Sequence, residues 1–176
     1  MHEAATELFD QNLEIAASAL FEHLGVEVNF EPPPDRAKCD LACSVGFASP
    51  NLRGSLTMTA DRAFVINSRP PELRGTAPSE LEISDWMGEL GNQLLGRLKN
   101  RLIGYGVVID LGTPAVLFGV EIQRHLGRRP VACERFIRSA DGKLVIHLDA
   151  DVSENFEILE ASHVEEAMPE GEVALF

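Results

Sequence analysis

The sequence predicts an α+β fold in which two long helices pack on a mainly antiparallel sheet. Two segments, 4–24 and 79–104, repeat apolar residues at the spacing of a helix face. The segments between and after them alternate apolar and polar residues, as half-buried strands do. A length of 176 residues and a hydrophobic content of 45% suit one compact core.

Four patterned segments begin the chain: a helical stripe over 4–24 and strand-like runs over 26–30, 39–48 and 53–59. Gly25 suits the left-handed residue that ends many helices. The three prolines at 32–34 form a stiff extended connector, and the Pro-Asn pair at 50–51 predicts the turn of a hairpin. Residues 63–67 fit either a short helix or an irregular strand, and the Pro- and Gly-rich stretch 68–78 predicts a loop.

The second long helix follows that loop. Ser79 or Ser84 can cap it, and the acids at 80 and 82 favour Ser79. The helix should end near Gly104. Four further strands are predicted at 107–111, 115–120, 130–138 and 143–149. The Ala-Asp-Gly sequence at 140–142 is a hairpin signal that joins the last two.

Acidic residues accumulate from Asp151 onward, with no Lys or Arg to balance them. This composition predicts a solvated helix followed by a frayed tail. We therefore expect one domain over residues 1–160 and an acidic C-terminal tail over residues 161–176.

One face of the second helix carries an unusual set of residues. At roughly 100° per residue, four of them fall within an arc of about 60°: Asp85, Glu89, Asn92 and Gly96. Glycines at 88, 91 and 96 flank the carboxylate and the carboxamide, although each costs a helix about 0.5–1 kcal/mol relative to alanine. Either another backbone approaches closely here, or the glycines pack on the chain's own sheet and Glu89 and Asn92 simply face water.

Glu89-x-x-Asn92, with Asp85 before it and Gly96 after it, resembles the signature of the CheC/CheX/FliY family of response-regulator phosphatases. That signature has an acid or serine, a glutamate and an asparagine at this spacing, with a proline farther along. Pro114 fits the proline position. The similarity covers residues 40–120 and is greater to the single-site CheX members than to the two-site members. It implies a CheX-like phosphatase domain over residues 1–160.

The resemblance implies that this chain completes the active site of another protein. Asn92 is expected to orient the water that attacks an aspartyl phosphate, because an amide can both donate and accept hydrogen bonds. Glu89 is expected to bind the receiver's active-site lysine. Four more residues are expected to contact the partner: Asp85, Trp86, Gly88 and Gly96. Mg²⁺ should belong to the receiver, so no cofactor or metal of this chain is expected.

The first helix resembles a remnant of a second copy of the motif. Asp10 and Glu14 have the spacing of the two acids, but Ala17 occupies the asparagine position. Without an amide this second site should be inactive. The resemblance alone also implies a homodimer joined through the sheets.

The composition argues against several classes of partner. A formal net charge of −13 disfavours nucleic acid and anionic membranes. No run approaches the roughly 18 apolar residues of a membrane helix, and the first residues lack the layout of a signal peptide, so a cytoplasmic protein is expected. The five histidines are scattered without the spacing of a metal site. Cys39 and Cys43 should face one side of a strand roughly 13 Å apart, as buried free thiols.

Two functions remain open at this point. One is a phosphatase that acts on phospho-CheY or a related receiver, and the other is a non-catalytic module that binds a receiver or scaffolds a two-component complex. Glu89 and Asn92 together favour the phosphatase, because docking alone does not need the amide. The sequence does not identify the receiver. It also does not distinguish chemotaxis from another two-component pathway.

Overall fold

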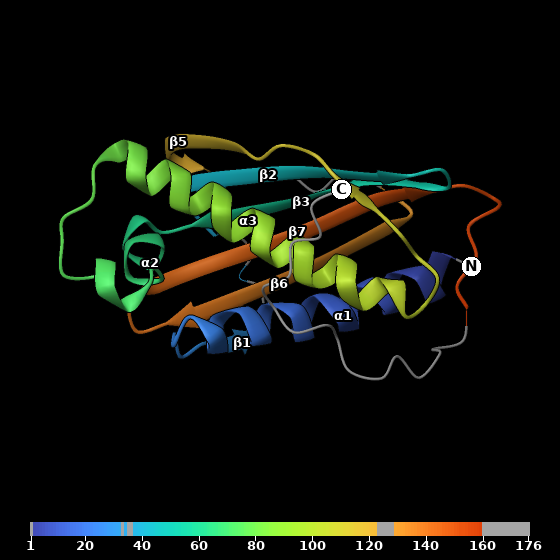
Figure 1. Cartoon of the computed structure of the whole chain (residues 1–176), viewed down its shortest axis with the longest axis horizontal. Coiled ribbons are helices and arrows are strands. Elements are labelled where there is room, and N and C mark those ends of the chain that lie inside the picture. Colours follow the sequence, from blue (N-terminus) through green and yellow to red (C-terminus); the bar gives the residue numbers. More distant parts are fainter. Residues whose placement is uncertain (1, 33, 35–36, 123–128, 160–176) are drawn as a thin grey trace, which may run out of the picture.

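A computed structural model describes residues 2–32, 34, 37–122 and 129–159, with one sheet as the body of the molecule and two long helices against it (Figure 1). The helices are α1 (His2–His23), α2 (Arg62–Asn67), the 3₁₀ turn η1 (Pro71–Leu73) and α3 (Glu80–Ile103). The strands are β1 (Asn29–Glu31), β2 (Cys39–Ser49), β3 (Leu52–Ala60), β4 (Asp110–Leu111), β5 (Ala115–Ile122), β6 (Val131–Ser139) and β7 (Gly142–Val152). The predicted α+β fold is confirmed.

Every strand pair in the described sheet is antiparallel, in the order β1-β6-β7-β3-β2-β4, with β5 also on β2. β4 and β5 share one edge of β2, where β4 pairs with residues 47–48 and β5 with residues 39–44. Residues 112–114 interrupt what would otherwise be one edge strand, and the N–H of Gly112 donates to the carbonyl of Gly46 (2.7 Å). This interruption carries Pro114 toward α3.

Both long helices contribute to one hydrophobic core. The buried stripes of α1 and α3 meet alternate residues of the strands, among them Leu41, Cys43 and Val45 of β2. α3 contacts β2 and β5, whereas α1 contacts β6 and α3. None of the described helices combines the length and apolar character needed to span a bilayer.

Most predicted elements are confirmed. Gly25 ends α1 with φ +63°, both hairpins form, and residues 63–67 belong to a helix rather than a strand. The first strand is shorter than predicted and pairs only over 29–31, and of the strand predicted at 107–111 only 110–111 pair.

The helix predicted after Asp151 is wrong for the described residues, because β7 continues to Val152 and residues 153–159 are not helical. Phe156 is buried and anchors this segment on the core. The predicted tail over 161–176 lies outside the described residues.

The three cysteines are buried and free, as predicted. Cys43 lies in the main core, but Cys39 packs with Phe136 and Val145 in a separate cluster, so the prediction that the two share a side is wrong. A register shift between Cys39 and Leu41 breaks the alternation of the strand. Burial raises the pKa of Cys43 to about 11, which leaves a protonated, unreactive thiol at neutral pH.

The close packing of α3 on β2 can be tested at the glycines of α3. A Cβ at Gly91 would lie 2.9 Å from Sγ of Cys43 and 3.0 Å from Cγ2 of Val45. Gly91→Ala should therefore lower the free energy of unfolding by about 1–2 kcal/mol in urea titrations. Gly96→Ala is the control, because its Cβ meets no atom within 4 Å and should stabilise α3 by about 0.5–1 kcal/mol. Equal stabilities of the two variants would contradict the close contact.

Candidate functional site

α3 begins at a capping box, which sets the residue at which the helix starts. The Ser79 hydroxyl accepts from the N–H of Glu82 (3.3 Å), and the Glu82 carboxylate accepts from the N–H of Ser79 (2.8 Å). These bonds favour the ionised carboxylate and lower the pKa of Glu82. Ser79 is the cap, as the acids at 80 and 82 predict, and Ser84 lies inside the helix with its side chain half-buried.

The helix presents opposite faces to the core and to solvent. Its buried apolar face contains Ile83, Met87, Leu90, Leu94, Leu95, Leu98 and Leu102. On the other side Asp85 and Glu89 are exposed and Asn92 is half-buried. Packing of the apolar face thus holds the polar stripe at the surface.

An open hollow with a volume of about 300 Å³ lies between α3 and the start of β5. Its lining comprises Ser84, Asp85, Gly88, Glu89, Asn92, Thr113, Pro114 and Val116. Gly88 forms part of the floor, and a Cβ there would lie 3.7 Å from Pro114 and from Val116, which is ordinary contact. The structure therefore brings Glu89, Asn92 and Pro114 together, as the motif implies.

Two carboxylates, those of Asp85 and Glu89, line the hollow. Within the described residues neither Asp85 nor Glu89 forms an ion pair. The amide of Gln93 donates one hydrogen bond to Oε1 of Glu89 (2.8 Å) and adds no charge. This arrangement leaves a carboxylate that can accept from an external cation.

Trp86 and Gly96 lie outside the lining of the hollow. The indole N–H of Trp86 donates to Oγ of Ser68 (3.1 Å), and Ser68 donates to the carbonyl of Val65 (2.9 Å), so the half-buried Trp86 ties α3 to the end of α2. Gly96 faces open space. Partner contacts of these two residues stay predictions.

Sequence reasoning missed three polar residues at or beside the hollow. Ser84 precedes Asp85 by one residue but was considered only as a helix cap, and Thr113 directly precedes the motif proline. Gln93 follows Glu89 by four residues, the spacing at which two side chains meet on a helix. That spacing alone could have identified Gln93, whereas the approach of Thr113 depends on pairing between distant strands.

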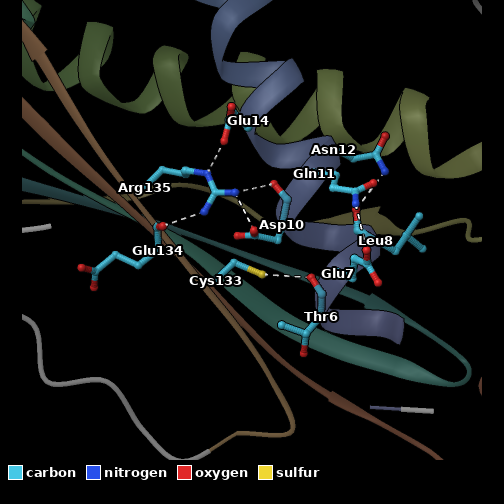
Figure 2. A network of polar contacts seen from close by, with 10 residues as sticks. All are labelled: Thr6, Glu7, Leu8, Asp10, Gln11, Asn12, Glu14, Cys133, Glu134 and Arg135. Atoms are coloured by element: carbon cyan, nitrogen blue, oxygen red, sulfur yellow. Dashed lines mark hydrogen bonds and ion pairs between the residues drawn. The ribbon is translucent and has the colours of Figure 1, made fainter. Parts of the chain in front are cut away.

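The corresponding acids of α1 form ion pairs with an arginine of the same chain (Figure 2). Arg135 of β6 binds Oδ2 of Asp10 (2.5 Å) and Oε2 of Glu14 (2.9 Å). Burial disfavours the charge of Arg135, but its bonds to the two acids outweigh that effect and raise its pKa. Ala17 is fully buried. The α1 stripe therefore offers neither an open carboxylate pair nor an amide at the motif position.

No group of three or more His, Cys, Asp or Glu side chains has the arrangement of a metal site in the described part of the chain. The expectation that this chain holds no metal or cofactor stays a prediction.

Comparisons with known proteins agree with this geometry. The family model described as chemotaxis phosphatase CheX matches residues 41–136. A crystal structure of CheX from Vibrio vulnificus is similar with a TM-score of 0.69 and 22% identity, over 81% of this chain and 96% of that one. A CheC-like protein from Shewanella oneidensis has a TM-score of 0.65 and 24% identity, over 82% and 96%. None of the curated proteins matches the sequence.

A third similar structure is a complex of CheX with CheY, BeF3 and Mg²⁺ from Borrelia burgdorferi. Its TM-score is 0.59 and its identity 17%, over 80% of this chain and 96% of that one. These structural similarities extend well beyond the residues that the family model matches.

The Arg135 cluster should contribute to stability. Arg135→Met keeps much of the apolar stem but leaves Asp10 and Glu14 without their cation, so the free energy of unfolding should fall by about 1 kcal/mol. Arg138→Met on the same strand is the control: Arg138 pairs with Glu31 (3.0 Å) at a more exposed site, and its loss should change stability by less than about 0.5 kcal/mol. Urea titrations compare the two, and equal losses would contradict a special role of Arg135.

Proposed function

Because the chain belongs to the CheX family of chemotaxis phosphatases, we propose that it dephosphorylates the aspartyl phosphate of a CheY-like receiver domain. One observation carries the proposal: a carboxylate that forms no ion pair within the described residues, Glu89, shares an open hollow beside Pro114 with the carboxamide of Asn92. The Borrelia relative, solved in complex with CheY, supports a receiver as the partner.

Asn92 orients the attacking water in this proposal. A phosphorylated receiver already supplies the aspartyl phosphate, Mg²⁺ and a lysine, so the missing element is a water held in line with phosphorus. The amide oxygen of Asn92 accepts a hydrogen bond from that water, and the NH₂ group donates to a neighbouring acceptor. Half-burial of Asn92 restricts its side chain before the partner arrives.

Glu89 docks the helix onto the receiver. Its carboxylate accepts a charge-assisted hydrogen bond from the receiver's lysine, which places Asn92 over the phosphorus. Asp85, one turn earlier, contacts the rim of the receiver's active site. Mg²⁺ is the receiver's, so this chain supplies neither metal nor nucleophile, and we infer a cytoplasmic location from such a partner.

The glycines and Trp86 complete the contact surface. Gly88 has no side chain that would fill the hollow. Gly96 leaves room for the partner's backbone at the C-terminal end of the polar stripe of α3. Trp86 is the single tryptophan of the chain and lies next to Asp85, so its fluorescence reports the docking.

The alternative is a non-catalytic module that binds receivers or scaffolds a complex. Docking needs the carboxylate and the shape of the hollow but not an amide aimed at the phosphorus. Asn92 therefore separates the two functions experimentally.

The test follows decay of the phosphoryl group on each receiver of the same organism, with and without this protein. We expect Asn92→Ala to lower kcat by about a hundredfold while the affinity for the receiver changes less than about threefold. Asn100→Ala is the matched control, because Asn100 is exposed on the same helix outside the hollow. Glu89→Ala should weaken binding by about tenfold or more and lower kcat as well.

The outcomes separate the two functions. Faster decay that disappears in Asn92→Ala identifies both the activity and the substrate. Binding to a receiver without faster decay would favour the scaffolding module. Loss of binding in Asn92→Ala would remove the support for a role confined to the water.

We also propose that two copies join through β5. This strand pairs with β2 on one edge only in the described sheet, and its exposed large apolar residues are Leu117, Phe118 and Val120. An open apolar edge strand invites pairing with another strand. Val120, the most exposed of the three at 90%, is the position to change.

Sedimentation velocity should show a species of twice the 19.3 kDa chain, and Val120→Lys should convert it to the monomer. Val108→Lys is the control, because Val108 is exposed but lies before β4. A monomeric wild-type protein, or a dimer that survives Val120→Lys, would show that β5 is not the interface.

A further inference from the structure

We propose that Gln93 is a positioning residue for Glu89, an inference that rests on the proposed function. Nε2 of Gln93 donates to Oε1 of Glu89 at 2.8 Å, from the next turn of α3. Gln93 does not line the hollow, so it does not meet the receiver's phosphoryl group directly. It acts through the carboxylate that it holds.

An exposed glutamate samples many rotamers, and fixing them on binding has an entropic cost. Gln93 is half-buried, so its own side chain is partly fixed by packing. A hydrogen bond from a restrained amide reduces the freedom that Glu89 must lose when the receiver docks.

The direction of the bond also suits the site. Gln93 lies one turn after Glu89, on the flank of Glu89 away from Asn92, so the bond holds the carboxylate without occupying the side on which Asn92 lines the hollow. Pro114 and Val116 contact α3 at Gly88, on the opposite flank of Glu89 from Gln93. Glu89 is thus held from one side, and the hollow is open on the other.

A neutral donor is the appropriate residue at position 93. An amide occupies one carboxylate oxygen and leaves both the charge and Oε2 for a lysine of the partner. Lys or Arg at 93 would form a salt bridge with Glu89 and compete with that lysine. Glu at 93 would repel the carboxylate.

The test is a double-mutant cycle between Gln93 and Glu89. Gln93→Ala should weaken binding to the beryllofluoride-loaded receiver by about threefold to tenfold and raise KM more than it lowers kcat. In the Glu89→Ala background the same change should have no effect. Gln93→Lys should weaken binding further than Gln93→Ala, because it neutralises Glu89.

Gln11→Ala is the matched control. Gln11 donates to Glu7 (3.1 Å) with the same spacing on α1, away from the hollow, so its loss should leave receiver binding unchanged. Equal effects of Gln93→Ala with and without Glu89, or unchanged binding of Gln93→Ala, would overturn the proposal.

A second measurement needs no receiver. The side-chain amide resonances of Gln93 in the free protein should shift in Glu89→Ala, and those of Gln11 should not. Resonances that do not respond would overturn the positioning role whatever the receivers show. Resonances that respond while no receiver binds would refute the proposed function, and with it the role that rests on it.

Discussion

Close packing of α3 on β2 at Gly91 sets the position of the whole candidate site. The sulfur of Cys43 and a methyl group of Val45 occupy the space that a Cβ would need. Rotation of α3 by one residue would replace glycine with a larger side chain at this contact. The helix is therefore locked in one phase, and Glu89 and Asn92 must turn away from the sheet because they share the helix with Gly91.

The sequence was sufficient for the features that depend on local periodicity. The 3.6-residue repeat located α3 and its polar stripe, and the serine and glutamate of the capping box located its start. Of the two explanations for the glycines, packing on the chain's own sheet holds at Gly91, while Gly96 faces open space. Spacing alone could not tell these two glycines apart, because tertiary structure decides which part of a helix face is covered.

Features that depend on distant pairing could not be read from the sequence. The break at 112–114 arises where β4 and β5 pair with different parts of β2, and it brings Thr113 and Pro114 beside α3. Family resemblance anticipated Pro114 but not Thr113. The hydrogen bond from Trp86 to Ser68 could not be predicted either, because Ser68 lies 18 residues earlier in the chain.

The contrast between the two long helices is the strongest physical argument for an external partner. Both carry two acids one turn apart, in a chain with a net charge of −13. Arg135 bonds to both acids on α1, whereas within the described residues neither acid on α3 forms an ion pair and Gln93 donates a neutral hydrogen bond to Glu89. The same fold thus places an arginine against the acids of α1 but, among the described residues, no arginine against the acids of α3. Since clustered carboxylates repel each other, the open pair is best satisfied by a cation that the partner brings.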